Sequence, residues 1–350
     1  MCNIAGYIGK RRAAPILIEM MKKQEGYGGG FYTGIATLEG NKLNTAKVIG
    51  DVKRFLDETD GASFPGNVGF LHSRSNSGGG VEWGQPYVSS SGKIAYIANG
   101  HAGRFIADEY RSKRDNLAEE LEGIGYVCPS KVKGVIGDYP RLSDGTAVHM
   151  SDLMCQYIEF LTNQGYEIAE AISKANEKMP SEIVNMTLSE DHPGKLYVSR
   201  VNFPMMIGIA DDGDIYLATT ALAFPDNVNF RTVELLPPAT TVEVTYGGYT
   251  IAHYRMDLFN VQPITPAIWH KAYVRLESFL SGREQNPATV QNAIDACEDL
   301  WDKDKLDQGA PLIYEMMREF NREGRLGVAK VLIDGAFNGY TTERFMIYLK

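Results

Sequence analysis

The second residue of the chain brings together two groups that can break an amide bond. Cys2 follows Met1, and its small side chain predicts that the initiator Met is removed. The mature chain then carries a thiol and a free α-amine on one residue. An α-amine has a pKa of about 7.7–8.0 in model peptides, so it can accept a proton near neutral pH. The pattern predicts an N-terminal nucleophile that is activated by its own amine. The alternative is a small buried apolar residue, as free cysteines often are.

A second group of candidates follows a strand expected at residues 68–73. The sequence continues into Arg74 and then into a polar, glycine-rich loop that includes Ser77 and Gly78. A guanidinium presents two parallel N–H donors, which suits it to binding a carboxylate. Arg74 is therefore a candidate for substrate binding, and the alternative is a solvated surface arginine.

A third candidate is the pair Asn99-Gly100, which follows a strand expected at 94–98. A side-chain amide and a neighbouring backbone N–H can form an oxyanion hole for a tetrahedral intermediate. Asn-Gly after an alternating strand is also the strongest short signal for a hairpin turn. Both interpretations remain open from the sequence.

These candidates lie in a chain whose pattern predicts blocks of strands and helices. A short buried strand is expected within the first nine residues, and the other expected strands are 32–38, 42–49, 68–73, 94–98, 195–201, 205–210, 215–219, 240–246 and 249–254. The expected helices are 12–24, 117–121, 147–164 and 168–178. Turn signals such as Gly247-Gly248 indicate antiparallel hairpins, so the pattern favours an α+β fold over a doubly wound parallel sheet.

The sequence pattern changes near residue 266. From there to residue 350 we expect a mostly helical region of unknown role, closed by a strand at 344–349. We therefore expect two parts, a catalytic domain at 2–265 and a C-terminal region at 266–350.

Composition excludes several classes of function. The net charge is −9 and the pI is about 5.3, which argues against nucleic acid or an anionic membrane as a partner. The four cysteines show no paired spacing, so we expect neither a metal site nor a disulfide framework, and no cofactor. No secretory signal or membrane span is evident, which predicts a cytoplasmic protein.

Taken together, Cys2, His72-Ser73-Arg74, Gln85-Pro86 and Asn99-Gly100 resemble the class II glutamine amidotransferases in order and spacing. That family belongs to the N-terminal nucleophile (Ntn) hydrolases, and the resemblance covers roughly residues 2–110. It implies a four-layer αββα sandwich of two antiparallel sheets. Among the family's varieties, the chain is most similar to stand-alone amidotransferase subunits related to glutamate synthase.

The resemblance also implies roles for individual residues. Cys2 would be the nucleophile, with Asn99 and Gly100 as the oxyanion hole. Hydrolysis of L-glutamine would pass through a γ-glutamyl thioester and release ammonia to a partner synthase. Arg74 would bind the α-carboxylate of glutamine, Ser77 would also touch the substrate, and Asp144 would bind its α-amine.

Departures from the family pattern keep two alternatives open. Asn3 stands where glycine is usual, and residues 27–34 replace the family's Arg-Gly-x-Asp-Ser stretch. One alternative is an Ntn-type amidase that acts on another amide or a γ-glutamyl substrate. The other is a degenerate, non-catalytic regulatory subunit, although such a subunit would need none of Cys2, Arg74, Asn99 and Gly100.

Overall fold

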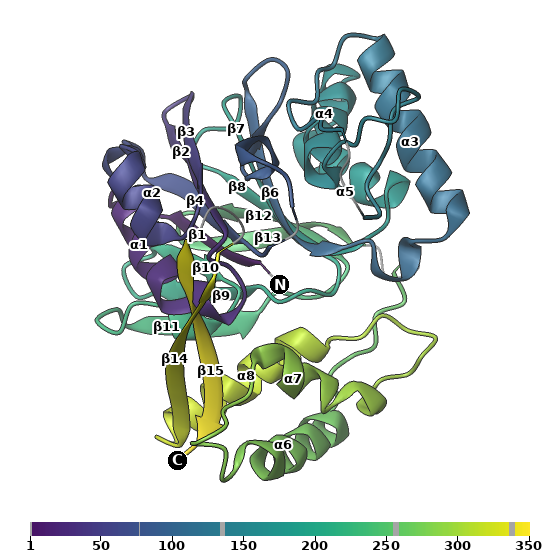
Figure 1. Ribbon diagram of the computed structural model, residues 1–350. Coiled ribbons are helices and arrows are strands. Elements are labelled where there is room, and N and C mark those ends of the chain that lie inside the picture. Colours follow the sequence, from purple (N-terminus) through teal and green to yellow (C-terminus); the bar gives the residue numbers. More distant parts are fainter. Residues whose placement is uncertain (1, 77, 134–136, 255–258, 336–339) are drawn as a thin grey trace.

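Two antiparallel sheets stacked face to face form the centre of the molecule (Figure 1). The computed structural model describes residues 2–76, 78–133, 137–254, 259–335 and 340–350. The first sheet has the order β11-β9-β10-β1-β4-β2-β3 and the second has the order β13-β12-β8-β7-β6-β5. The strands of the first sheet are β1 (Asn3–Ile8), β2 (Tyr32–Glu39), β3 (Lys42–Ile49), β4 (Val68–Arg74), β9 (Met206–Ala210), β10 (Ile215–Ala218) and β11 (Phe230–Leu235). Those of the second are β5 (Tyr87–Val88), β6 (Ile94–His101), β7 (Glu182–Ser189), β8 (Leu196–Arg200), β12 (Thr240–Thr245) and β13 (Gly248–Tyr254).

Helices cover the outer face of each sheet. Helices α1 (Ala13–Gln24) and α2 (Val52–Glu58) pack on the first sheet. Helices α3 (Asp108–Gly123), α4 (Met150–Asn163) and α5 (Ile168–Lys178) lie together on the second (Figure 1). The predicted α+β fold with four αββα layers is confirmed.

Strand β1 lies at the centre of the first sheet and is buried on both faces. Its residues alternate between two cores, because successive side chains of a strand point to opposite faces. Ile4 and Ile8 pack between the sheets, whereas Ala5 and Tyr7 pack under α1. The strand pairs with β4 on one side and β10 on the other, which fixes the position of Cys2 just before it.

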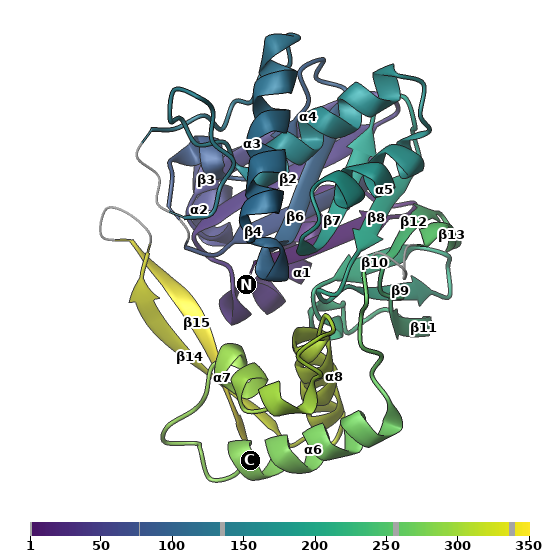
Figure 2. The same cartoon turned by 90° about the vertical axis from the view of Figure 1, so that its right-hand side faces the viewer.

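The C-terminal region lies below the sandwich and has its own hydrophobic core (Figure 2). It contains α6 (Pro266–Leu280), α7 (Val290–Asp295), α8 (Gly309–Arg322) and a long hairpin of β14 (Leu326–Asp334) and β15 (Thr341–Leu349). Thr265 caps α6 by accepting a hydrogen bond from Ile268 N, with Pro266 in the first turn. The expectation of a mostly helical region is therefore incomplete, because the strand expected at its end pairs with β14 as a hairpin.

Strand β6 corrects one interpretation made from the sequence. It continues through Asn99 and Gly100, which pair with Val184 and Ile183 of β7. The hairpin-turn alternative for Asn99-Gly100 is therefore wrong. Strands β7 and β11 and helix α2 were not expected, and the short helix expected at 117–121 is part of α3.

Within the described parts of the chain, no helix combines the length and the apolar character needed to cross a membrane. The cytoplasmic location expected from the sequence stays a prediction.

Candidate functional site

Cys2 lies in the wall of a cavity of about 950 Å³, which we call the Cys2 cavity. Its lining comes from both sheets, from the start of α4 and from the C-terminal region. The lining residues include Cys2, Arg74, Ser75, Asn99, Gly100, Asp138, Tyr139, His149, Met150, Glu182, Phe203, Gln291, Ile294, Asp307 and Ala310.

The ends of β1 and β6 bring Cys2 and Asn99 together, although 97 residues separate them in sequence. Cys2 N donates a hydrogen bond to Asn99 Oδ1 at 3.0 Å. The thiol lies 3.5 Å from Ser75 N, which donates to Sγ, and 3.7 Å from Ser75 Oγ. Both polar ends of Cys2 are thus held, and the residue is only 9% exposed.

His72 is the electrostatic partner of the Cys2 thiol. It is fully buried on β4, and its Nε2–H donates to Ala98 O at 3.1 Å. That bond engages Nε2 and leaves Nδ1 with no hydrogen-bond partner among the described residues. Burial raises the pKa of the thiol, but its interaction with the nearby His72, the charge of the N-terminus and the Ser75 amide outweigh burial, and the pKa falls to about 6. Sequence analysis quoted His72 but gave it no role.

Asn99 presents an unused donor beside the thiol. Its Oδ1 accepts the hydrogen bond from Cys2 N, so Nδ2 points away from Cys2 N. Nδ2 is buried and finds no hydrogen-bond partner within the described part of the structure. Buried donors are nearly always paired in native proteins, so an unpaired one next to a nucleophile suggests a missing ligand oxygen.

Position 100 requires a glycine, because of its backbone conformation and the close approach of β7. Its φ is +145°, and an added Cβ would lie 2.1 Å from Glu182 O on β7. A larger residue would therefore separate β6 from β7 next to Asn99.

Arg74 is buried rather than solvated, so the surface alternative is wrong. It is 1% exposed, and its guanidinium lies 4.7 Å from the ring centroid of Tyr32 and 5.7 Å from that of Trp83. Nη1 donates to Gly78 O at 3.0 Å. Nη2 has no partner among the residues that the structure covers. Arg74 therefore offers one free, charged donor at the Cys2 cavity.

Comparisons with known proteins bear on this arrangement. No protein-family model matches the chain. The glutamine–fructose-6-phosphate aminotransferase (isomerizing) of Bacteroides thetaiotaomicron is 30% identical over 227 residues, which cover 63% of this chain and 32% of the relative. That of Chlorobaculum tepidum is 28% identical over 255 residues, or 72% of this chain and 37% of the relative.

Two solved structures share the fold. A glutamine phosphoribosylpyrophosphate amidotransferase from B. subtilis has a TM-score of 0.55 at 17% identity, and it covers 74% of this chain and 50% of its own. An allosteric regulatory enzyme of purine biosynthesis has a TM-score of 0.58 at 16% identity, and the match covers 90% of this chain and 63% of that enzyme's chain. The chain therefore has the fold of a glutamine amidotransferase and is similar in sequence to glutamine–fructose-6-phosphate aminotransferases. It spans about a third of the length of the curated relatives it matches.

The loop at 26–30 overlaps the stretch that departs from the sequence motif of the class II glutamine amidotransferases. Tyr27 belongs to the core of the C-terminal region, with its ring 5.2 Å from Phe345 and 6.2 Å from Tyr314. Gly26 lies against Phe345 so closely that an added Cβ would be 2.2 Å from its ring. Gly29 N donates to Asn3 Oδ1 at 2.9 Å. The loop at 26–30 therefore packs against the C-terminal region through Gly26 and Tyr27. Its Gly29 is bound by Asn3, the residue after Cys2.

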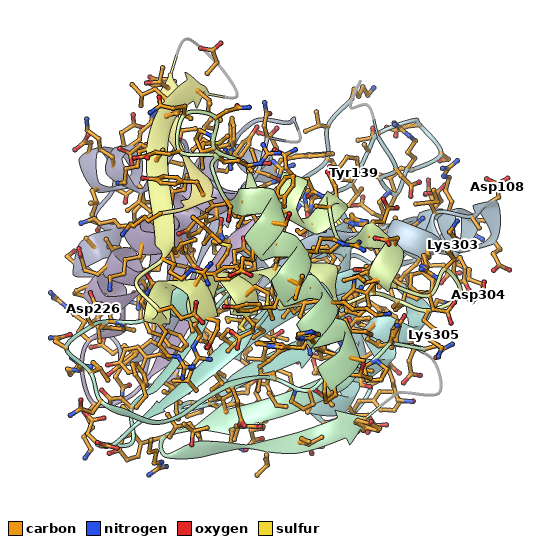
Figure 3. The ribbon with its side chains drawn as sticks, turned by 90° about the horizontal axis from the view of Figure 1, so that it is seen from below. Asp108, Tyr139, Asp226, Lys303, Asp304 and Lys305 are labelled. Carbon is orange, nitrogen blue, oxygen red and sulfur yellow. The ribbon has the colours of Figure 1, made fainter. Side chains whose placement is uncertain are left out.

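The C-terminal region also closes one side of the Cys2 cavity. Gln291, Ile294, Asp307 and Ala310 supply part of the lining. Nearby, the guanidinium of Arg104 donates to the backbone oxygen of Lys303, next to the start of α3 (Figure 3). The region is therefore a wall of the site.

Of the predicted substrate residues, Asp144 is not brought to the cavity. Asp144 is exposed, and its Oδ1 accepts a hydrogen bond from Thr146 N at 2.8 Å within its own turn. It is absent from the cavity lining, so the structure gives no support to its predicted role at the α-amine. Ser77 lies outside the described residues.

His149 is a cavity residue that sequence analysis missed. It is the N-cap of α4, and its Nδ1 accepts a hydrogen bond from Ser151 N at 3.1 Å. Its ring contacts Trp83, Tyr87 and Tyr139 at centroid distances of 5.2, 5.1 and 5.7 Å. Histidine is not among the usual N-cap residues, so no local pattern in the sequence indicated this position.

Proposed function

We propose that this chain hydrolyses the γ-carboxamide of glutamine or of a glutamine derivative through a thioester on Cys2. The observation that carries the proposal is the pairing of an acidic buried thiol with the unpartnered Nδ2 of Asn99. A thiolate is the attacking species in cysteine catalysis, so a pKa of about 6 keeps it populated at neutral pH.

The proposed reaction has two stages. Sγ of Cys2 attacks the amide carbon, and the resulting oxyanion accepts hydrogen bonds from Asn99 Nδ2 and the Gly100 N–H. The proton from the thiol, held by His72 or by the α-amine, passes to the amide nitrogen. The C–N bond then breaks and ammonia leaves. Water attacks the thioester, which yields a γ-carboxylate and restores the thiol.

Arg74 supports recognition of the substrate carboxylate. Its free Nη2 and its aromatic neighbours hold a planar charged group at the cavity wall. Orientation of the carboxylate would place the amide against Cys2, which lowers the entropy cost of reaction.

The ammonia acceptor is proposed to lie on a partner synthase. The relatives named as aminotransferases are about three times longer than the region that they match in this chain. The division into a catalytic domain at 2–265 and a C-terminal region at 266–350 stays a prediction, as does similarity to glutamate-synthase subunits.

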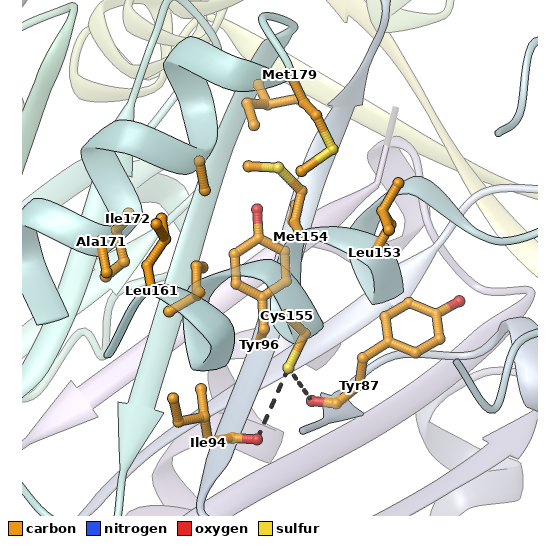
Figure 4. Close-up of a cluster of buried hydrophobic side chains, with 14 of the residues drawn as sticks. Tyr87, Ile94, Tyr96, Leu153, Met154, Cys155, Leu161, Ala171, Ile172 and Met179 are labelled. Atoms are coloured by element: carbon orange, nitrogen blue, oxygen red, sulfur yellow. Dashed lines mark hydrogen bonds between the residues drawn. The ribbon is translucent and has the colours of Figure 1, made fainter. Parts of the chain in front are cut away.

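The non-catalytic alternative is not favoured. Burial, together with the charges of Asp152 and Glu159, raises the pKa of Cys155. This residue of α4 packs among apolar side chains, with its thiol near the carbonyls of Tyr87 and Ile94 (Figure 4). Burial also raises the pKa values of Cys128 and Cys297. Cys2 alone among the four has a lowered pKa, which a scaffold does not need.

A test uses ammonia release from γ-carboxamides that carry a free carboxylate, glutamine and N-acetylglutamine among them. Cys2→Ser is expected to lose most of the activity, because a hydroxyl is a much weaker nucleophile at neutral pH. Cys155→Ser is the matched control, since its hydroxyl can donate to the same two carbonyls. Unchanged turnover in Cys2→Ser would overturn the proposal.

Asn99→Ala tests the oxyanion hole. We expect kcat to fall by roughly a hundredfold or more, with little change in KM. Asn185→Ala is the control, because Asn185 is a buried residue of β7 that bonds Asn176 and does not line the cavity. If both variants lose stability and neither loses turnover, Asn99 has only a structural role.

A further inference from the structure

Asn3, the residue after Cys2, is the point at which the β1 strand starts to be held by its neighbours. It is fully buried, and it is the first residue of β1 to pair with β4, opposite Ser73. The pairing of β1 with β10 starts at Ala5. Cys2 lies before the strand, and a residue at a chain end stays in place only where it is tied down. The placement of Cys2 therefore depends on how firmly Asn3 is held.

The side chain of Asn3 points away from the space between the two sheets. Alternation along β1 places it on the same face as Ala5 and Tyr7, which pack under α1. Its Oδ1 accepts a hydrogen bond from Gly29 N at 2.9 Å, in the loop at 26–30 that packs against the C-terminal region. One atom of the Asn3 amide is thereby engaged, and Nδ2 remains.

Tyr314 of α8 lies at the remaining donor of Asn3. Asn3 Nδ2 and the Tyr314 hydroxyl are both buried, and neither has a partner of regular hydrogen-bond geometry among the described residues. The two groups interact, because burial raises the pKa of Tyr314 whereas the Asn3 amide, as a donor to the phenolic oxygen, lowers it. The Tyr314 ring also lies 6.2 Å from the ring of Tyr27, in the same loop as Gly29. Since buried polar groups are nearly always paired in native proteins, these two are each other's partners.

The contacts of Cys2 are sensitive to a small shift at this end of β1. Cys2 N donates to Asn99 Oδ1 at 3.0 Å, and Ser75 N donates to the thiol at 3.5 Å. Ser75 directly follows β4, the strand with which Asn3 pairs. A shift of Asn3 is therefore passed to both contacts, and a misplacement of about 1 Å can cost on the order of a hundredfold in rate.

We infer that Asn3 is a positioning residue for Cys2, and that the hydroxyl of Tyr314 holds the Asn3 amide in place. The C-terminal region then acts on the nucleophile through a polar contact, besides closing one side of the Cys2 cavity. This inference goes beyond the proposed function, because it concerns the placement of the thiol and holds for any amide that Cys2 attacks.

The test removes single groups from the full-length protein and follows the pH profile of Cys2 alkylation by iodoacetamide. Tyr314→Phe keeps the ring beside Tyr27 and removes only the hydroxyl. We expect the midpoint to rise from about 6 by roughly half a unit or more, since a displaced thiol loses part of its stabilising contacts. For ammonia release, kcat should fall by about fivefold with little change in KM.

A double-mutant cycle shows whether Tyr314 acts through Asn3. Asn3→Ala should shift the midpoint at least as far as Tyr314→Phe, because the acceptor of Gly29 N is lost as well. Once Asn3 is replaced, Tyr314→Phe should add nothing further, since the pair that it breaks is already gone.

Tyr96→Phe is the matched control for the loss of a buried hydroxyl. The Tyr96 hydroxyl is likewise buried with no partner in the described ranges, but it lies in the core under α4 and does not line the Cys2 cavity (Figure 4). This variant should keep the midpoint near 6 and the kcat of wild type.

The outcomes separate this inference from the proposed function. A Tyr314→Phe protein with the midpoint and kcat of wild type would overturn the inference, whatever its melting temperature. Equal effects of Tyr314→Phe with and without Asn3 would also overturn it, because the tyrosine would then act by another route. If the midpoint shifts as expected but wild type releases no ammonia from any γ-carboxamide, the positioning contact stands and the proposed function fails.

Discussion

At the scale of single residues, the protonation of Cys2 depends on its neighbours, and His72 has the largest effect among those that lower the pKa of the thiol. His72 is held by Ala98 O through Nε2, and its interaction with the thiol lowers a pKa that burial alone would raise. The two effects oppose one another, and the local partner is the stronger. Sequence spacing gave the position of His72 but not the direction in which its ring would turn.

His72→Gln should reveal this dependence in the pH profile of alkylation. The variant can still donate to Ala98 O but lacks the imidazole ring, whose charge stabilises the thiolate. In wild type, alkylation of Cys2 by iodoacetamide should rise with pH through a midpoint near 6, because the thiolate forms above that pH. In the variant the midpoint should move upward by roughly one unit or more. The rate of alkylation of the Cys2 peptide, measured over about pH 5–9, tests this prediction.

His192→Gln is the control for that profile, since His192 lies in the turn between β7 and β8. It should leave the midpoint near 6. An unchanged midpoint in His72→Gln would mean that the α-amine alone activates the thiol.

The predicted residues differ in how well the sequence could place them. Cys2, Arg74 and Asn99 stand at strand ends, where a short motif also fixes the direction of the side chain, and all three line one cavity. Asp144 stands in Ser-Asp-Gly-Thr, a typical turn sequence, and its carboxylate satisfies its own turn. His149 acts through a cap and a cavity made by distant elements, so no local pattern pointed to it.

At the scale of elements, the pairing of strands overrides local turn signals. Asn99-Gly100 stays extended because β7 pairs with it, and β7 lies more than 80 residues away in sequence. The positive φ of Gly100 is accommodated inside the strand end rather than in a turn. Short-range patterns could not have shown this, since the partner strand itself was not expected.

The loop at 26–30 provides a prediction at this scale. Tyr27→Ala should lower the free energy of unfolding by about 3 kcal/mol, because a large ring is removed from a packed core. Tyr246→Ala, at a position that is 43% exposed, should cost far less. Urea denaturation of the three proteins measures the difference, and equal losses would show that the loop does not anchor the C-terminal region.

At the scale of the whole molecule, two parts share polar contacts that neither could satisfy alone. Arg200 of β8 is buried, and burial lowers its pKa to about 9. Its guanidinium donates to Phe203 O and Leu236 O, and across to Gln308 Oε1 at 2.6 Å. Gln308 Nε2 in turn donates to Gln262 O at 2.8 Å. These hydrogen bonds connect β8 of the second sheet to the start of α8.

Gln308→Ala should therefore destabilise the protein by about 2 kcal/mol, because a buried charged donor loses its acceptor. Gln285→Ala, at an exposed position between α6 and α7, should change stability little. Thermal and urea unfolding check both variants. A Gln308→Ala protein as stable as wild type would show that the backbone carbonyls alone satisfy Arg200.

Much of this architecture could be predicted from the sequence, and the exceptions have a physical cause. The change near residue 266 was visible because helix-forming periodicity starts there with Pro266 at a helix start. The hairpin was only half expected, because β14 has exposed apolar residues such as Leu332 and lacks the clean alternation of a half-buried strand. The order of strands in each sheet depends on pairings between distant segments, which local patterns do not contain.

The indole of Trp83 gives the site an optical signal. It lies against Arg74 and His149, and its Nε1 donates to Ser130 O at 2.7 Å. The two other tryptophans, Trp269 and Trp301, are in the C-terminal region. Replacing Trp269 and Trp301 with phenylalanine would leave Trp83, which lies next to Arg74 and His149, as the one tryptophan. Its emission could then follow the arrival of a carboxylate in real time, without a coupled assay for ammonia and in a Cys2→Ser protein that holds its substrate uncleaved.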